Sequence, residues 1–389
     1  MKFKLLFSLL LLVFFGCKKS ELTIAPNIEK EIGESVYSTT KISDEYKATT
    51  FIDPKIQKTS EEVLKEALIT NQADYGCVVI METTTGRIKA MVNLNKADDG
   101  SYNYKEATAV SQANEPGGLM RTFDLLALLE DNKADTTSVY DTHGGEISFF
   151  GKKIQDSHLI NGKISLANAF TISSNSVFAQ AINNSYSTDA NLFCNRYKKL
   201  GFDKPLDLPF THEGAPIFPD PKSKEWSSIT LPWLSIGYGL TLTPIQILTF
   251  YNSIANNGVM VKPLFLSEIK NKEGNTKKYL PQVLNSKIAS PKTISTLQFL
   301  LTKKINGAEN EIITENNVKV AGSAATISLD YAEAEIKEKR YLSSFVGYFP
   351  ANKPKYSILC FIYNPKVNVP VYSSLVSGKA IKSIIEKIK

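Results

Sequence analysis

The segment that decides the fold is Ile236–Gln246, which reads IGYGLTLTPIQ. Its two glycines favour a bend, because glycine adopts backbone conformations that other residues avoid. Thr243 suits the N-cap of a helix and Pro244 suits its first turn, so the pattern predicts that a helix begins here. The residues that follow are largely apolar until Gly258, where the helix is expected to end. The segment therefore predicts a bend followed at once by a buried helix.

Other parts of the chain alternate between strand and helix patterns. Gly76–Met81 and Ile88–Val92 are apolar runs joined by a short segment containing Thr-Gly, which predicts a β-hairpin. Helical spacing of apolar residues is found in Ile56–Ile69 and Leu119–Glu130, and the C-terminal residues 372–389 form an amphipathic helical pattern. This mixture indicates an α+β fold.

The cysteines indicate buried thiols. After Cys17 only Cys77, Cys194 and Cys360 remain, and each lies in an apolar pattern, which is more typical of core thiols than of a disulfide framework. The strand around Val79 and the one around Leu359 are both apolar enough to be buried on two faces, so we expect them to be neighbours. Cys77 and Cys360 would then lie near one another, unlinked.

The first residues have the pattern of a secretory signal. Two lysines precede the apolar run Leu5–Phe15, which is too short to span a bilayer as a helix. Gly16-Cys17 is similar to the cleavage site of bacterial lipoproteins, which implies that residues 1–16 are removed and that Cys17 becomes the lipidated N-terminus. An ordinary cleaved signal peptide is the alternative. Lys18 is not the aspartate of the inner-membrane retention signal, so the outer membrane is slightly favoured.

Composition separates a tether from a domain. Residues 17–48 are polar and mixed in charge without a sustained period, so we expect a flexible tether that reaches on the order of 30 Å. Residues 49–389 suffice for one large domain, and an apolar content of 43% fits a globular protein. The net charge of +6 is spread along the chain, which argues against nucleic acid as a partner and suits anionic wall polymers or lipid headgroups.

From about residue 49 to its end, the chain resembles the transpeptidase domain of class B penicillin-binding proteins, which cross-link peptidoglycan. That family carries Gly-x-Gly-x-x-x-Thr-Pro-x-Gln where this chain has Gly237–Gln246. Residues 343–351 and Tyr356–Tyr363 resemble the two closing strands of the family's sheet. The resemblance implies a β-lactamase/transpeptidase-like fold, in which a central antiparallel sheet is flanked by helices and joined to an all-helical lobe. It implies no metal and no cofactor.

The family's first catalytic motif is Ser-x-x-Lys, in which the lysine activates the serine. The matching segment Glu115–Arg121 reads EPGGLMR, with Gly118 at the serine position and Arg121 at the lysine position. Glycine offers no nucleophile, and arginine stays protonated, so it cannot accept a proton as a general base. The sequence therefore predicts that the covalent chemistry is missing.

The second motif is Ser-x-Asn, which Ser173 and Asn175 match. The resemblance implies that the serine relays a proton and that the asparagine binds the amide of the substrate. Simple helix capping is the alternative, because serine and asparagine are frequent N-caps.

The third motif is Lys-Thr/Ser-Gly followed by Thr, and its positions are occupied here by Ser323, Ala324, Ala325 and Thr326. In the family the lysine and the hydroxyl bind the carboxylate of the substrate. Ser323 supplies no charge and Ala324 no hydroxyl, so each lost contact removes roughly 1.5–3 kcal/mol of recognition. The candidate cleft-binding residues are Ser173, Asn175, Ser323 and Thr326.

Two functions from different classes remain open. The favoured one is a catalytically inactive cell-envelope lipoprotein that binds or scaffolds in cell-wall synthesis, with peptidoglycan or cell-wall synthesis and division proteins as partners. The alternative is an active D,D-transpeptidase or carboxypeptidase with a displaced nucleophile, for which the candidates are Thr122, Ser323, and Ser173 assisted by Lys163. A decaying copy without a role is a third reading.

Overall fold

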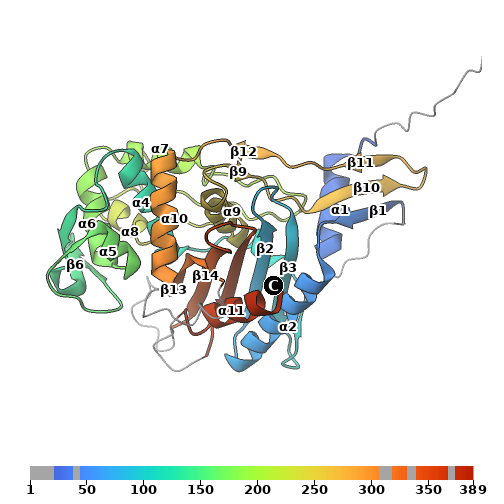
Figure 1. Ribbon diagram of the computed structural model, residues 1–389, viewed down its shortest axis with the longest axis horizontal. Helices are drawn as coiled ribbons and strands as arrows, with labels where there is room; N and C mark the ends of the chain where they lie inside the picture. Colours follow the sequence, from blue (N-terminus) through green and yellow to red (C-terminus); the bar gives the residue numbers. More distant parts are fainter. Residues whose placement is uncertain (1–21, 38–43, 306–317, 331–338, 367–372, 389) are drawn as a thin grey trace, which may run out of the picture.

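The computed structural model describes residues 22–37, 44–305, 318–330, 339–366 and 373–388 (Figure 1). At its centre is a six-stranded sheet in which every neighbouring pair is antiparallel. In spatial order its strands are β13 (Ala321–Ser328), β14 (Tyr341–Phe349), β15 (Tyr356–Tyr363), β2 (Tyr75–Glu82), β3 (Ile88–Lys96) and β4 (Tyr102–Asn103). The predicted α+β class and the predicted opening hairpin, β2 with β3, are confirmed.

The strands β2 and β15 are neighbours, as expected, with Val79 paired to Leu359. Cys77 is opposite Phe361 and Cys360 is opposite Val78, so the two cysteines occupy adjacent rungs and point to opposite faces of the sheet. Both are buried free thiols, one in the core on each face.

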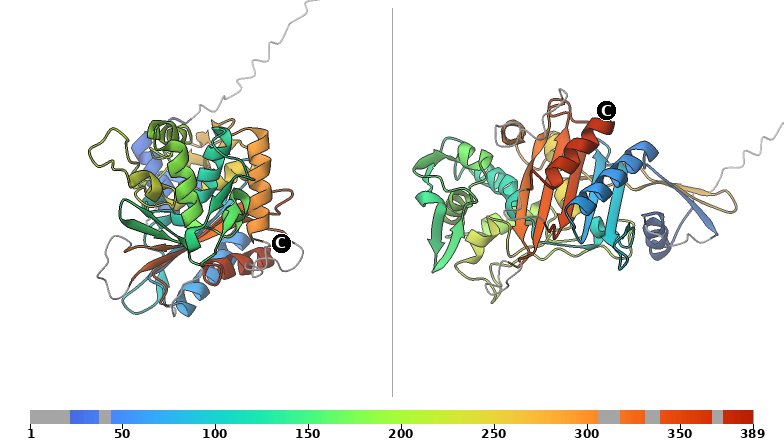
Figure 2. Two further views of the ribbon diagram at one scale, coloured as in Figure 1. Left: turned by 90° about the vertical axis from the view of Figure 1, so that its left-hand side faces the viewer. Right: turned by 90° about the horizontal axis from the view of Figure 1, so that it is seen from below.

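Helices cover both faces of this sheet (Figures 1 and 2). On one face α2 (Pro54–Thr70) packs against α11 (Ser377–Ile388), and their aliphatic residues form a core with Val78, Ile80 and Ile358. On the other face lie α3 (Thr108–Ser111) and α9 (Pro244–Ala255), while α10 (Pro291–Ile305) packs against β13 at the edge of the sheet.

A helical lobe extends from the second face. It begins with the 3₁₀ turn η1 (Gly117–Met120) and α4 (Arg121–Glu130), and continues through α5 (Leu166–Thr171), α6 (Asn175–Tyr186), α7 (Ala190–Lys199) and α8 (Thr230–Leu234). Its core is aromatic, with the Phe123 ring 3.7 Å from the Tyr197 ring, centroid to centroid. Besides its helices the lobe carries the short turn η2 (His143–Gly145) and two small ladders, β5 (Val139–Asp141) with β8 (Lys163–Ser165) and β6 (Glu146–Phe149) with β7 (Lys152–Gln155).

The prediction of a flexible tether over residues 17–48 is wrong for the part that the structure describes. α1 (Pro26–Tyr37) is an ordered helix whose Ile32 is buried and whose Glu29 forms an ion pair of 2.5 Å with Lys277. β1 (Tyr46–Thr50) then pairs with β10 (Leu266–Asn271), which pairs with β11 (Thr276–Lys278). The helix is stabilised by these distant partners, because its own polar composition gives little tendency to fold alone.

The remaining strands, β9 (Met260–Val261) and β12 (Val283–Asn285), form a two-stranded ladder beyond the end of α9. Within the described residues, no helix combines the length and the apolar character needed to cross a membrane.

Candidate active site

The bend predicted at Ile236–Gln246 holds the start of η1 in place. Gly237 and Gly239 both have positive φ angles, 79° and 78°, and a Cβ on Gly237 would lie 2.5 Å from the Cα of Gly117. Only glycine permits this approach, across which the Gly117 amide donates a 3.0 Å hydrogen bond to the Gly237 carbonyl. The Gly239 amide in turn donates to the Glu115 carboxylate at 2.8 Å.

The helix that follows the bend begins as the sequence predicts. Thr243 and Gln246 form a capping box, in which the side chain of each residue accepts a hydrogen bond from the backbone amide of the other. The whole of α9 is buried, and its Tyr251 hydroxyl donates a 2.9 Å hydrogen bond to the Leu119 carbonyl of η1. The bend and α9 therefore fix η1 from two sides.

The Arg121 guanidinium occupies the space beside Gly118. A Cβ built on Gly118 would overlap this group and lie 2.6 Å from its Cζ. Arg121 is 5% exposed, and its Nη1 donates a 2.5 Å hydrogen bond to the Asn175 Oδ1, while the Asn175 Nδ2 donates to the Gln155 carbonyl at 2.8 Å. The structure thus brings Gly118, Arg121 and Asn175 together and links η1 to α6 and β7 through the arginine.

Two carboxylates contribute to the electrostatics of Arg121. Burial lowers the pKa of its guanidinium, and the negative charges of Asp156 and Asp124 raise it in opposition. Asp156 also accepts hydrogen bonds from the Ser174 hydroxyl, at 2.8 Å, and from the Ser176 amide, at 2.8 Å. Because an arginine side chain remains protonated in proteins, the centre of the site holds a fixed cation.

Asp124, one helical turn after Arg121, is fully buried, and its carboxyl group forms no hydrogen bond with any described residue. Burial raises its pKa well above the ordinary value, and the charge of Arg121 lowers it by less.

Lys304 of α10 is a second buried cation near the site. Its Nζ donates a 3.0 Å hydrogen bond to the Phe170 carbonyl and lies 4.8 Å from the centre of the Phe170 ring. Burial lowers its pKa well below the ordinary value, and the positive charge of Arg121 lowers it further. Lys304 was not predicted as a site residue, although its spacing after Leu300 and Leu301 places a lysine on the apolar face of a helix.

Ser323 is 1% exposed and lies on the same face of β13 as Ala325 and Ile327. It lies beside the Tyr251 hydroxyl, but the Ser323 hydroxyl forms no hydrogen bond with any described residue. Burial raises the pKa of Tyr251, and its hydrogen bond with Thr122 lowers it in opposition. Tyr251, which was not predicted as a site residue, therefore lies between η1 and Ser323.

Thr326 was predicted together with Ser323 as a cleft-binding residue, and this role stays a prediction. Strand alternation turns Thr326 and Ala324 to the face opposite Ser323. There Thr326 is exposed, and its hydroxyl hydrogen-bonds with the Ser373 hydroxyl at 2.9 Å.

Helix capping does not explain Ser173 and Asn175. The N-cap of α6 is Ser174, whose hydroxyl accepts from the Val177 amide at 3.2 Å. Ser173 precedes it with a positive φ of 64°, and Asn175 binds Arg121.

The two elements that carry the first and third motifs, η1 and β13, are in direct contact. A Cβ on Gly117 would overlap the side chain of Ile327, so β13 packs on η1 without a gap. The Tyr238 hydroxyl, from the bend, accepts a 3.3 Å hydrogen bond from the Ser328 amide farther along β13.

Among the candidates for a displaced nucleophile, Thr122 is fully buried and its hydroxyl is hydrogen-bonded to the Tyr251 hydroxyl at 2.7 Å. Cys17, the predicted lipid attachment site, lies outside the described residues.

Comparison with known proteins agrees with this architecture. Residues 76–386 match the family model of the penicillin binding protein transpeptidase domain. The peptidoglycan D,D-transpeptidase FtsI of Buchnera aphidicola (subsp. Schizaphis graminum) is 25% identical over 359 residues, covering 87% of this chain and 58% of that protein. The Escherichia coli K12 enzyme of the same name is 22% identical over 347 residues, covering 84% and 55%. The chain thus spans a little over half the length of these curated relatives.

Among solved structures, the transpeptidase domain of Burkholderia pseudomallei penicillin-binding protein 3 matches with a TM-score of 0.72 and 20% identity, covering 90% of this chain and 96% of that one. A peptidoglycan synthetase from Bifidobacterium adolescentis matches with a TM-score of 0.75 and 18% identity, covering 88% and 61%. These likenesses show the fold, and the predicted sheet, helices and lobe are confirmed by them. The chain belongs to the family of penicillin-binding-protein transpeptidase domains.

Proposed function

We propose that this protein is a catalytically inactive member of its family, a cell-envelope lipoprotein that acts by binding or scaffolding in cell-wall synthesis. The observation that carries the proposal is the Arg121 guanidinium, which fills the space beside Gly118 where the side chain of a nucleophile would lie. In related enzymes that space belongs to the attacking hydroxyl, and here it holds a cation that cannot accept a proton.

The asparagine of the second motif is also engaged. Asn175 accepts from Arg121 and donates to the Gln155 carbonyl, so both ends of its amide are used inside the protein. Each end of the amide keeps one further hydrogen-bonding site, so a peptide substrate would have to share Asn175 with these internal partners. Ser323 adds neither a cation nor an exposed hydroxyl for a substrate carboxylate, because it is 1% exposed.

The alternative of a displaced nucleophile has little support. A hydroxyl nucleophile needs a base beside it and access for the substrate. Thr122 is fully buried and hydrogen-bonded to Tyr251, whose own pKa is raised by burial, so that phenol stays protonated. Ser323 faces the same tyrosine.

A binding role is consistent with a scaffold that is intact around the altered positions. The bend, the capping box and the six-stranded sheet are all present. The residues that form these features maintain the fold and take no part in a catalytic reaction. The relatives named above are peptidoglycan D,D-transpeptidases. The proposed partners are therefore peptidoglycan and the proteins of cell-wall synthesis and cell division.

Labelling with a fluorescent β-lactam tests the proposal against restored variants. The wild type and Gly118→Ser should remain unlabelled, because the new serine would meet the Arg121 guanidinium and gain no base. The matched variant Gly118→Ser/Arg121→Lys/Ser323→Lys/Ala324→Thr/Ala325→Gly restores all three positions. Labelling of the wild type itself would contradict the proposal.

Complementation separates the two functions in cells. A chain with Thr122→Val, Ser173→Ala and Ser323→Ala lacks every candidate hydroxyl nucleophile. If the role is binding, this chain restores a cell-wall phenotype caused by deletion as well as the wild type does. If the folded variant accumulates normally and fails, the displaced-nucleophile reading is supported.

The proposed anchor is tested by Cys17→Ser. Stable attachment of a lipoprotein requires more than one acyl chain, all attached through this cysteine. The variant should stay folded and leave the membrane fraction, and continued sedimentation with membranes would contradict the lipid anchor.

A further inference from the structure

One edge of the molecule, away from the motif positions, carries exposed cations. α7 ends in Lys198 and Lys199, and Lys204 follows in the next loop; all three are exposed. They line a hollow of about 340 Å³ whose wall includes Leu284 of β12. None of the three forms an ion pair with another residue that the structure describes.

Leu284, which lines the same hollow as these lysines, is one of three exposed aliphatic side chains on β12 and just before it. Leu280 is 78% exposed, Val283 55% and Leu284 40%, within five consecutive residues. Among described strands, β12 pairs with β9 alone, so its other side is an open edge. We name this surface the β12 edge and define it by these six residues: Lys198, Lys199, Lys204, Leu280, Val283 and Leu284.

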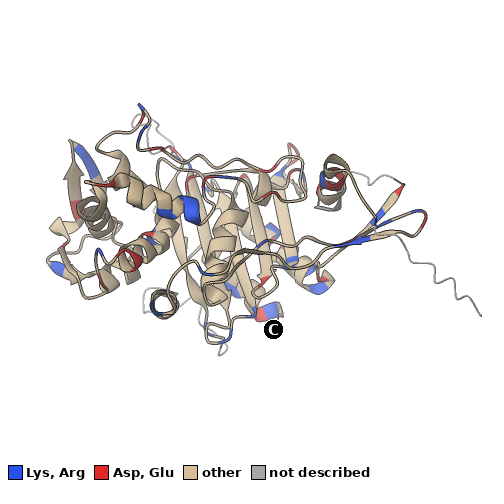
Figure 3. Ribbon diagram, turned by 90° about the horizontal axis from the view of Figure 1, so that it is seen from above, with Lys and Arg blue, Asp and Glu red and all other residues tan. Residues whose placement is uncertain are grey.

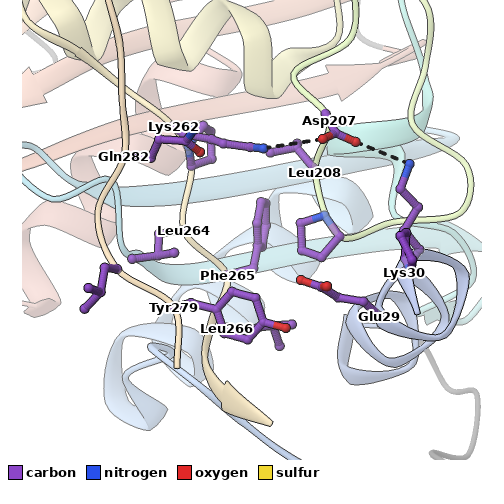
Figure 4. Close-up of a pocket in the computed structure, with 14 residues that line it drawn as sticks. Glu29, Lys30, Asp207, Leu208, Lys262, Leu264, Phe265, Leu266, Tyr279 and Gln282 are labelled. Atoms are coloured by element: carbon purple, nitrogen blue, oxygen red, sulfur yellow. Dashed lines mark ion pairs between the residues drawn. The ribbon is translucent and has the colours of Figure 1, made fainter. Parts of the chain in front are cut away.

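A second hollow, of about 330 Å³, continues the β12 edge toward the N-terminus (Figure 4). Leu280 lines it together with Pro26 of α1, and Asp207 lines both hollows. Asp207 faces Lys30 at 3.5 Å and Lys262 at 3.9 Å. The charged residues that line the two hollows are five lysines against two acids, namely Lys30, Lys198, Lys199, Lys204 and Lys262 against Glu29 and Asp207. The surface is therefore basic as well as apolar.

The proposed anchor would hold the β12 edge close to a bilayer. Pro26 is the first residue of α1, and it lies nine residues after Cys17 (26 − 17). Fully extended, nine residues span about 30 Å. α1, α7 and β12 lie along one edge of the molecule, while α2 and α11 lie along the opposite edge (Figure 1). Figure 3 views the molecule from the side of the first edge, with lysines and arginines in blue.

We propose that the β12 edge is a second membrane contact, in which the aliphatic side chains enter the bilayer interface and the lysines bind the phosphates of anionic phospholipids. This inference rests on the lipid anchor of the proposed function. Apolar insertion and polybasic attraction are each weak, and together they hold a protein at an anionic surface. The domain would then lie against the membrane, with the face carrying α2 and α11 free for other partners.

Vesicle co-sedimentation tests the contact without the anchor. The chain from Lys18 onward keeps every described residue and lacks Cys17. We expect it to sediment with vesicles of phosphatidylcholine containing phosphatidylglycerol, and to dissociate as salt rises. Lys198→Ala/Lys199→Ala/Lys204→Ala should lower the partition coefficient roughly a hundredfold, because each lysine near an anionic surface contributes about a fivefold factor.

The matched control removes the same charge from the opposite edge. Lys55→Ala/Lys65→Ala/Lys379→Ala takes three exposed lysines from α2 and α11, and should change binding by no more than about twofold. Leu280→Ser/Val283→Ser should reduce the part of the binding that salt does not screen.

Three results would overturn the inference. They are absence of binding to anionic vesicles, equal losses in the two lysine variants, and binding to isolated peptidoglycan sacculi through the β12 edge in place of vesicles. Failure of the anchor would be seen separately, as absence of radiolabelled palmitate on the full-length chain. Failure of the catalytic proposal would be seen as β-lactam labelling.

Discussion

The Nη1 of Arg121 donates a hydrogen bond to the Oδ1 of Asn175 at 2.5 Å, joining the first helix of the lobe to the helix that carries the second motif. The two residues are 54 positions apart in sequence. At the same time the guanidinium covers Gly118, so one side chain fills the space beside Gly118 and engages the asparagine of the second motif. Because of this contact, we expect Arg121 to stabilise the fold.

Arg121→Ala should lower the free energy of unfolding by roughly 2–5 kcal/mol, because it removes the buried hydrogen bond to Asn175 and opens a cavity beside Gly118. Arg121→Lys keeps the charge and should cost less. Denaturant unfolding of both variants measures the difference. A loss below about 0.5 kcal/mol in Arg121→Ala would show that the contact does not stabilise the site.

Gly118→Ala should destabilise the wild type and be tolerated when Arg121 is alanine. In the wild type the new Cβ overlaps the guanidinium, whereas Gly118 has no positive φ that would itself penalise alanine. We expect a coupling free energy of roughly 1–3 kcal/mol in a double-mutant cycle. Additive effects of the two substitutions would contradict the placement of Arg121.

Asp124 gives the stability a pH dependence of predictable sign. Its folded pKa lies well above the ordinary value of 3.8, because of burial, so between these two values the folded state holds a proton that the unfolded state has lost. The contribution of this group is therefore fully present below pH 3.8 and decreases as the pH rises toward the folded pKa.

Asp124→Asn removes this titration and keeps the shape of the side chain. The variant should gain stability relative to the wild type between about pH 4 and about pH 8, as measured by unfolding at both values. A difference that is constant over this range would mean that Asp124 is ionised in the fold.

The thiols of Cys77 and Cys360 should resist both oxidation and alkylation in the folded protein. Burial raises the pKa of Cys77 to about 12 and that of Cys360 well above its ordinary value, so neither forms thiolate at neutral pH. Because they point to opposite faces of the sheet, they cannot join. Mass measurement after iodoacetamide treatment, with and without denaturant, should show modification only after unfolding.

Much of the fold could be predicted because its signals are local or periodic. The glycines of the bend, the Thr243 cap and the apolar runs of β2 and β15 each depend on a few neighbouring residues. α1 could not be predicted in this way. Its stability depends on distant partners such as Pro209, whose carbonyl packs so closely on Gly33 that no Cβ would fit.

The positions of the site residues could be predicted from the sequence. The side of the strand or helix on which each side chain lies could be predicted less well. Gly118, Arg121 and Asn175 come together as the motif spacing predicts, but which way the Arg121 side chain turns depends on a residue from another helix. The motif fixes the order of residues along β13, whereas strand alternation decides which face each residue lies on, so Thr326 lies opposite Ser323. Lys304 and Tyr251 lie in helices that the sequence patterns explain by core packing alone.

The measurement that tests the central claim most directly is the intact mass of the purified protein after prolonged incubation with penicillin. Acylation needs a nucleophile, a base beside it and a seat for the carboxylate. Loss of the nucleophile alone costs a serine hydrolase about a millionfold in rate, and further losses are not additive. We expect an unchanged mass and no turnover of D-Ala-D-Ala peptides. A stoichiometric increase in mass, mapped to any serine or threonine of the domain, would contradict it.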